Sequence, residues 1–302
     1  MVKGKFVRIV VLFITVYVAW VGTSAYLAHA TNFAWATRDQ KISRIQEIEE
    51  IAGLIVGGSN AVYSLSAERM STLTSEPWFN ASIINEGFTF ENNLLFLDDI
   101  VNSIDATKVK TVILSSIRLV KSKKAVGMIF RRGYGFDGGK LPPVWLPYDS
   151  IFGFINSEHN RIFPSFISRN GDLLHDEAEV CTTAGRPGNL QWATNDQIVS
   201  FIDSWLPAIH SRFPNAEVVI TIPSRYLSNE PDPLKEEAYV NRLETHITTW
   251  IANHKEAANL SVSVTPEPNY FVDSILCNNS NHFNAFGRQL RTNALYAAMV
   301  NK

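Results

Sequence analysis

The first part of the chain is a long apolar stretch that follows a short basic segment. Lys3, Lys5 and Arg8 precede an apolar run from Ile9 to about Ala30. Its length is close to the roughly 20 residues that span a bilayer. The apolar run therefore predicts one membrane-spanning helix within residues 1–30. Because basic flanks stay on the cytoplasmic side, the N-terminal end is expected inside the cell. The body of the protein then lies on the extracytoplasmic side, periplasmic or extracellular.

Two other interpretations of this segment stay open. Ala28-His29-Ala30 resembles a signal-peptidase site, which would make the protein secreted after cleavage. A buried core helix is the third alternative. We favour an uncleaved anchor because the apolar run continues through Trp20, Ala25, Tyr26 and Leu27.

A charged segment follows, with apolar residues at a helical spacing. Residues 38–50 are rich in charge and carry Ile42, Ile45 and Ile48 three positions apart. This pattern predicts an amphipathic helix, either a stalk or the first helix of the domain. We assign residues 31–50 to a helical stalk.

From residue 51 onward, short apolar runs alternate with segments of helical periodicity. The predicted strands are residues 51–56, 81–85, 111–116, 217–222 and 260–264. The predicted helices are residues 62–70, 94–104, 195–213, 233–255 and 284–300, and residues 194–197 resemble a capping box. This alternation predicts an α/β fold, a three-layer sandwich around a five-stranded parallel sheet.

One long stretch breaks the alternation. Residues 121–189 contain glycine pairs, prolines and many aromatic side chains, namely Tyr134, Phe136, Trp145, Tyr148, Phe152 and Phe154. Insertions after the carboxyl end of a strand often form lids or substrate walls. The alternative is an ordinary surface insertion that packs on its own aromatic residues. In both cases it belongs to a single domain over residues 51–302.

Composition narrows the possible partners. The chain has 302 residues, of which 46% are hydrophobic and 19% charged, with a formal net charge of −2. No basic stripe is present in the sequence, so we expect no nucleic-acid partner. No Cys/His spacing resembles a zinc site, so we expect no metal and no cofactor. Cys181 and Cys277 would form a disulfide in an oxidising compartment, or remain two buried thiols.

The candidate chemistry begins at the end of the first predicted strand. The sequence predicts a strand end, a tight turn and a helix start over Gly57-Gly58-Ser59-Asn60-Ala61. Open α/β sheets bind ligands at this edge, where a helix N-terminus also offers N–H groups. The arrangement suits a nucleophilic serine whose backbone N–H helps to hold an oxyanion. The other interpretation is a tight turn with a helix cap.

A histidine near the C-terminus provides a candidate base. His282 lies on a polar loop between the fifth predicted strand and the last helix. In a doubly wound sheet this loop lies at the same edge as Ser59. Histidine is the usual base for a serine near neutral pH, and a catalytic triad is defined in space rather than by sequence separation.

These two motifs together resemble the SGNH hydrolase family of GDSL-like esterases and acyltransferases. Gly57-Gly58-Ser59-Asn60 resembles the family's nucleophile turn, and Asn279-Ser280-Asn281-His282 resembles its Asp-x-x-His segment. The resemblance covers about residues 51–302 and implies a flavodoxin-like, SGNH-type fold. It also implies that Gly87 donates an oxyanion hydrogen bond. We expect the oxyanion or substrate-binding residues to be Gly58, Asn60, Asn85 and Gly87.

The chain departs from the family at two places. The third-block Gly-x-Asn-Asp is absent, because the third strand ends Leu114-Ser115-Ser116-Ile117-Arg118. The position three before His282 is Asn279 rather than aspartate. Asp273 lies nine residues before His282 on the same loop, and we favour it slightly over Asn279 as the partner of the base. If neither serves, a Ser–His dyad remains.

The resemblance and the N-terminal segment lead to three functional hypotheses. The first is O-acyl transfer, for example of acetyl groups, to a cell-envelope or exported polysaccharide. It requires an acyl-accepting carbohydrate and a separate membrane protein that supplies the acyl group. The second is an esterase that removes such groups from an acylated carbohydrate. The third is an inactive carbohydrate-binding or assembly protein, which the two departures favour.

Overall fold

The computed structural model describes residues 2–31, 33–83, 90–115, 165–174, 193–222, 225–226, 233–265, 270–271 and 282–301. The chain divides into two compact units. One comprises Met1–Asp39 and Lys123–Ser165, and the other comprises Gln40–Ser122 and Phe166–Lys302.

The first unit contains one long apolar helix. Helix α1 (Val2–Thr31) includes Gly4–Thr23, a 20-residue stretch long and apolar enough to cross a membrane. None of that stretch is buried, and Phe13 is 72% exposed. A helix of this length and composition suits a membrane. The predicted N-terminal apolar helix is therefore present, and both a membrane anchor and a signal sequence fit it.

Helix α2 (Phe33–Ile45) follows, and its second half belongs to the second unit. It starts and ends earlier than the helix predicted over residues 38–50. The helix ends at Ile45 because the N–H groups of Glu47 and Ile48 bond to carbonyls three residues back, in a tighter turn. Ile45 is fully buried in the larger hydrophobic core.

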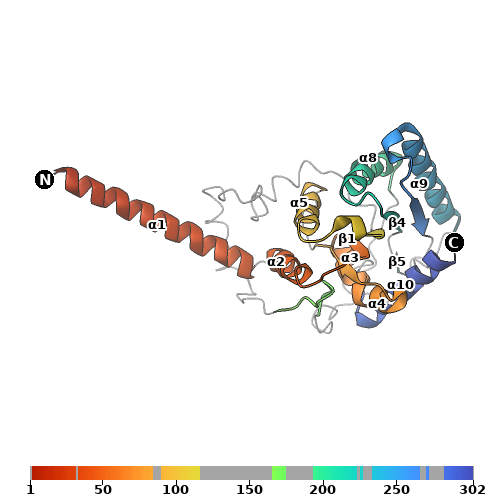
Figure 1. Ribbon diagram of the computed structural model, residues 1–302, viewed down its shortest axis with the longest axis horizontal. Coiled ribbons are helices and arrows are strands. Elements are labelled where there is room, and N and C mark those ends of the chain that lie inside the picture. Colours follow the sequence, from red (N-terminus) through yellow and green to blue (C-terminus); the bar gives the residue numbers. More distant parts are fainter. Residues whose placement is uncertain are drawn as a thin grey trace. The chain divides into compact units, whose positions relative to one another are not determined.

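The second unit is built on a five-stranded parallel sheet (Figure 1). Its strands are β1 (Gly53–Gly57), β2 (Trp78–Asn80), β3 (Thr111–Ser115), β4 (Glu217–Thr221) and β6 (Val262–Thr265). Their order, β2-β1-β3-β4-β6, is the flavodoxin-like doubly wound order, so the predicted fold class is confirmed. Two short strands that the sequence did not indicate, β5 (Arg225–Tyr226) and β7 (Tyr270–Phe271), pair in a separate sheet.

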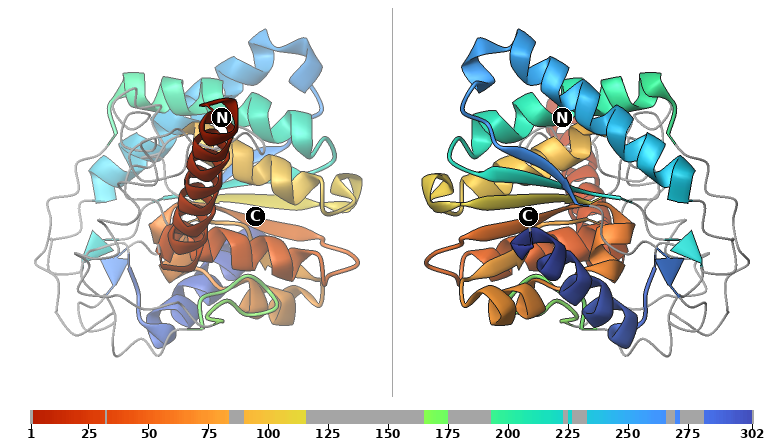
Figure 2. Two further views of the ribbon diagram at one scale, coloured as in Figure 1. Left: turned by 90° about the vertical axis from the view of Figure 1, so that its left-hand side faces the viewer. Right: turned by 90° about the vertical axis from the view of Figure 1, so that its right-hand side faces the viewer.

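Helices cover both faces of the sheet (Figure 2). Helices α5 (Phe90–Val101), α8 (Asn195–Arg212) and α9 (Pro233–Asn253) pack on the face to which Leu54 and Val56 contribute. Helices α3 (Ser59–Ser64), α4 (Ala67–Thr74) and α10 (Ala285–Val300) pack on the opposite face with Ile55. Short 3₁₀ turns, η1 (Ala106–Lys108) and η3 (Lys255–Ala257), precede β3 and β6. Successive residues of β1 thus feed two separate cores, as alternation along a strand requires.

The second strand is not where the sequence predicted it. It comprises Trp78–Asn80 rather than residues 81–85, and residues 84 and 85 lie outside the described residues. The Asn80 side chain accepts a hydrogen bond from the Ser82 N–H at 3.1 Å, and Ser82 Oγ donates to the Ile55 carbonyl at 3.2 Å. These side-chain bonds replace ladder bonds and end the regular pairing.

The helix predicted over residues 62–70 is in fact two helices, α3 and α4. Ser66 caps α4, because its Oγ accepts a bond from the Arg69 N–H at 3.1 Å. Asp172 completes the cap by accepting bonds from the Ala67 and Glu68 N–H groups, both at 2.9 Å. By contrast, the capping box predicted at the start of α8 is confirmed, with Thr194 and Gln197 bonded reciprocally.

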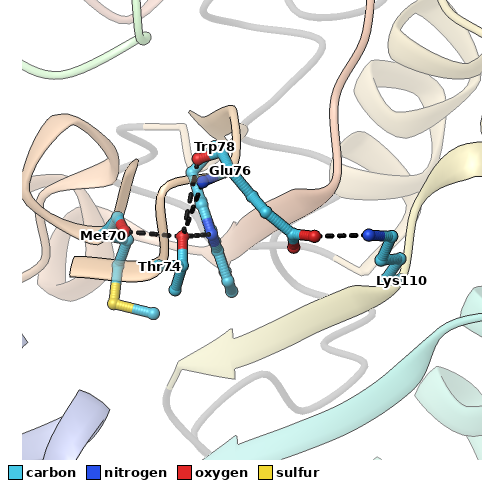
Figure 3. A network of polar contacts seen from close by, with 5 residues as sticks. All are labelled: Met70, Thr74, Glu76, Trp78 and Lys110. Carbon is cyan, nitrogen blue, oxygen red and sulfur yellow. Dashed lines mark hydrogen bonds and ion pairs between the residues drawn. The ribbon is translucent and has the colours of Figure 1, made fainter. Parts of the chain in front are cut away.

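The turn between α4 and β2 is fixed by one hydroxyl (Figure 3). Thr74 Oγ1 donates to the Met70 carbonyl at 2.9 Å and accepts from Trp78 Nε1 at 2.9 Å. The Glu76 side chain then pairs with Lys110, just before β3. These contacts join α4, β2 and β3 at the end of the sheet where the strands begin.

The segment over residues 166–174 of the insertion packs against the edge strand β2. Its carboxylate Asp172 accepts a bond from Asn80 Nδ2 at 3.1 Å. Lys41 donates to the backbone oxygen of Asn80 at 2.7 Å and to its Oδ1 at 3.3 Å. Lys41, Asn80 and Asp172 are all buried. Their hydrogen bonds join α2, β2 and this segment.

Candidate active site

Ser59 stands at the junction that the sequence predicted. It is the first residue of α3, directly after β1, and it is partly buried. The first bonds of the helix run from the Ala61 and Val62 N–H groups to the Gly58 carbonyl, at 2.9 and 3.1 Å. The N–H groups of Ser59 and Asn60 are therefore not used by the helix itself. An N–H pair of this kind can stabilise an anion beside the Ser59 hydroxyl.

Gly57 allows this junction to be tight. A Cβ at this position would lie 2.7 Å from the Ala61 Cβ and 2.8 Å from the Ser115 carbonyl oxygen. Both distances are shorter than a Cβ atom tolerates, and the Ser115 carbonyl belongs to the backbone, so it cannot move aside easily. Glycine at position 57 is what lets α3 pack directly on the ends of β1 and β3.

His282 lies against the same helix. Its ring contacts the ring of Tyr63, with centroids 4.4 Å apart and planes tilted by 38°. Tyr63 is four residues after Ser59, and residues at that spacing share one face of a helix. Two residues after His282, Asn284 begins α10 as its N-cap, accepting a bond from the Gly287 N–H at 2.9 Å. The chain therefore brings His282 to the helix that begins with Ser59.

Burial sets the protonation of both rings. Desolvation lowers the pKa of His282 to about 4, because it disfavours the charged imidazolium. The same effect raises the pKa of Tyr63 to about 12. At neutral pH the imidazole is therefore neutral and able to accept a proton, and the phenol keeps its proton.

A buried arginine that belongs to no sequence motif lies beneath this region. Arg291 of α10 is 1% exposed. One guanidinium nitrogen donates to Ser64 Oγ, and the other donates to the Ile222 carbonyl at 3.1 Å. A signal was present in the sequence, since Arg291 falls midway between Gly287 and Leu295 on the buried stripe of α10. A charge in such a stripe is unusual.

Hydroxyl groups line the carboxyl ends of the neighbouring strands. Gly57, Ser115, Thr221 and Thr265 are aligned across β1, β3, β4 and β6. Thr221 Oγ1 donates to Ser115 Oγ at 3.3 Å and accepts from Arg291 at 3.4 Å. Thr265 Oγ1 is buried and has no hydrogen-bond partner within the described part of the chain. This edge is thus polar although the strands themselves are apolar.

The remaining predicted site residues divide into two groups. Gly58 is the N-cap of α3, and Asn60 is buried in its first turn with its carbonyl accepting a bond from Ser64 Oγ. Others lie outside the described residues, namely Asn85, Gly87, Asp273 and Asn279, as do Cys181 and Cys277. The partner of the base, the Gly87 oxyanion donor and the disulfide therefore stay predictions. Among the residues that the structure describes, no cluster of three or more His, Cys, Asp or Glu residues could hold a metal ion.

Comparisons with known proteins add little to this picture. No protein-family model matches the chain, and no curated protein matches it. Among solved structures, the chain is similar to an extracellular lipase from Streptomyces rimosus, with 12% sequence identity and a TM-score of 0.31. The match covers 83% of this chain and 99% of the lipase chain. A likeness this weak does not assign a function, which must be inferred from the residues of the chain itself.

Proposed function

We propose that the protein catalyses acyl-ester chemistry with Ser59 as nucleophile and His282 as general base. The observation that supports this best is the contact between His282 and Tyr63, one helical turn from Ser59. This contact supports the pairing because the buried imidazole lies beside the helix that starts with Ser59. The carboxyl edge of the sheet is also where open α/β folds bind ligands.

The chemistry follows the usual course for a serine and a histidine. His282 takes the proton of the Ser59 hydroxyl as Oγ attacks an acyl carbonyl. The resulting oxyanion is held by backbone N–H groups of the Gly58–Asn60 turn and, as the family resemblance implies, by Gly87 with Asn85 nearby. The imidazolium then protonates the leaving alcohol, and an acyl-serine remains. A water or a sugar hydroxyl next attacks this ester and gives its proton to His282, which returns it to Ser59.

The finer proposal concerns the acceptor and the place of the reaction. Residues 1–30 would anchor the protein, residues 31–50 would connect the anchor to the domain, and residues 51–302 would be the catalytic domain outside the cytoplasm. Within this connection helix α2 ends at Ile45, and its second half is part of the second unit. An anchored domain of this kind suits O-acyl transfer to a cell-envelope or exported polysaccharide. One membrane helix cannot carry an acyl donor across the bilayer, so a separate membrane protein must supply it. Hydrolysis of acylated carbohydrate is the second candidate, in which water is the acceptor.

A fluorophosphonate probe on the detergent-solubilised full chain tests the nucleophile. We expect one label, on Ser59, that is lost in Ser59→Ala and strongly slowed in His282→Ala. Ser103→Ala is the matched control, because the Ser103 hydroxyl donates to the Asp99 carbonyl at 2.8 Å, in the turn that follows α5. Labelling that persists in Ser59→Ala would refute the proposal. A folded protein that takes no label would favour a binding or assembly protein.

A second experiment separates transfer from hydrolysis. The enzyme is given an aryl acetate with and without a neutral oligosaccharide, and the products are identified by mass spectrometry. Acetylated oligosaccharide that requires Ser59 indicates a transferase. Release of acetate alone, at a rate unaffected by the sugar, indicates an esterase.

A further inference from the structure

Arg291 occupies a position where an aliphatic side chain would serve packing alone. It lies on the buried stripe of α10, between Gly287 and Leu295. Removing a guanidinium from water is costly unless its donors are satisfied, and apolar replacements of buried charges are often equally stable. The position of Arg291 therefore calls for an explanation beyond filling space.

The contacts of Arg291 connect three parts of the candidate site. Toward α3 it donates to Ser64 Oγ, which in turn donates to the Asn60 carbonyl. Toward the sheet it donates to the Ile222 carbonyl at 3.1 Å and to Thr221 Oγ1 at 3.4 Å.

Its third contact is with the segment that carries the base. The guanidinium carbon lies 5.9 Å from the ring centroid of Phe283, which directly follows His282 and is 2% exposed. A cation over an aromatic ring at this distance is attractive.

Helix α3 needs such a connection. It has six residues, and a helix of that length has little stability of its own. Its orientation, and with it the direction of the Ser59 hydroxyl, must come from tertiary contacts. Arg291 holds the last residue of α3 to the end of β4, while its planar fork reaches both partners at once.

We propose that Arg291 is a positioning residue that fixes the helix of Ser59 and the segment of His282 in one geometry. This role rests on the proposed function, because it concerns the alignment of the proposed nucleophile and base. Arg291 itself does not touch the reacting groups in this proposal. It acts through Ser64 on one side and through Phe283 on the other.

Two variants and one matched control test this role in the full chain. Arg291→Lys keeps the charge but cannot reach Ser64 and Ile222 together. Ser64→Ala removes the link from Arg291 to α3, together with the bond from Ser64 Oγ to the Asn60 carbonyl. Asn293→Ala is the control, since Asn293 Oδ1 accepts a bond from Arg69 Nε at 2.7 Å and so joins α10 to α4 rather than to α3. The readouts are the second-order rate and final extent of fluorophosphonate labelling, and kcat and KM for an aryl acetate.

The role predicts a loss of rate without a loss of folded protein. A misplacement of about 1 Å can lower catalysis by about 100-fold. We therefore expect labelling and kcat to fall by about tenfold or more in Ser64→Ala and by up to about 100-fold in Arg291→Lys. KM should change little, labelling should still reach completion, and Asn293→Ala should behave as wild type.

Three outcomes would overturn the role. In the first, Ser64→Ala and Arg291→Lys are labelled as fast as Asn293→Ala. In the second, these three variants are slowed equally. In the third, labelling stops at a partial extent that matches the unfolded fraction of the protein. If Arg291→Lys does not fold, Ser64→Ala decides alone. Persistent labelling in Ser59→Ala would instead refute the proposed function, and is recognised independently of position 291.

Discussion

The ring of Tyr63 lies against the imidazole of His282, with centroids 4.4 Å apart. Because burial lowers the pKa of His282 to about 4, the imidazole stays neutral down to about that pH. Desolvation alone would therefore put the acid limb of kcat/KM, which reports the free enzyme, well below pH 6.5, and the carboxylate partner that we predict, Asp273, would move that limb back toward higher pH.

Removing the Tyr63 ring should shift the acid limb of kcat/KM to higher pH. Tyr63→Ala admits water to the imidazole, so the pKa of His282 should rise toward its ordinary value of 6.5. Activity at pH 5 should then fall relative to activity at pH 8. Tyr63→Phe keeps the ring and should keep the wild-type profile. The measurement is kcat/KM for an aryl acetate between pH 4 and pH 9, and identical profiles in all three proteins would contradict the prediction.

Gly57 should not tolerate a methyl group. In Gly57→Ala the new Cβ would meet the Ser115 carbonyl at 2.8 Å and the Ala61 Cβ at 2.7 Å, so α3 must shift. We expect a loss of about 1–3 kcal/mol in the free energy of unfolding, together with slow labelling of Ser59. Gly22→Ala is the control, since nothing lies within 4 Å of a Cβ built there. Chemical denaturation and labelling rates check both, and equal behaviour of the two variants would count against the tight junction.

Because of Lys41, the free energy of unfolding should change with pH in the alkaline range. Burial lowers its pKa to about 7, opposed by the charge of Asp172 and assisted by that of Arg288. In the unfolded chain a lysine pKa is about 10.4, so between these values the unfolded state binds more protons. The free energy of unfolding should therefore rise with pH, by about 1 kcal/mol per unit from pH 7 to pH 10.

The matched variant for this prediction is Lys41→Met. It cannot titrate, so its unfolding free energy should lack that rise when the two proteins are compared by urea denaturation at each pH. Parallel curves for the two proteins would mean that Lys41 keeps its ordinary pKa in the folded state.

The partner of His282 is expected to be a carboxylate. We predict that Asp273→Asn slows turnover sharply, since loss of the aspartate lowers kcat by up to about 10⁴ in serine proteases. Asn279→Ala should have only a mild effect, because an amide orients the ring without stabilising its charge. Steady-state kcat values for both variants test this. If Asn279→Asp raises activity and Asp273→Asn changes nothing, Asp273 has been chosen wrongly.

Local sequence signals predicted the parts of the fold that depend on neighbours in the chain. The β1–Ser59–α3 junction and the Thr194 capping box each involve only a few consecutive residues. The break between α3 and α4 was missed because its cap is completed by Asp172, more than 100 residues away. The second strand was misplaced because residues 81–85 are as apolar as Trp78–Asn80, and the Asn80 side chain decides where pairing stops.

The candidate site shows the same division. Ser59 and His282 lie in recognisable motifs, and the structure places both at helix α3. Arg291 carries no motif, and its importance depends on Ser64, Ile222 and Phe283 meeting it in space. Long-range hydrogen bonds of this kind leave only an indirect trace in the sequence, such as a charge on an otherwise apolar stripe.

The segment over residues 166–174 has a consequence for the solution behaviour of the folded protein. It lies along β2, an edge strand, where the Asn80 N–H donates to the Asn170 carbonyl at 2.8 Å and Asn170 Nδ2 donates to the Trp78 carbonyl at 3.1 Å. An uncovered edge offers such groups to strands of other molecules and invites aggregation. Here they are already satisfied within the chain, so this edge cannot act as a template for intermolecular β-pairing.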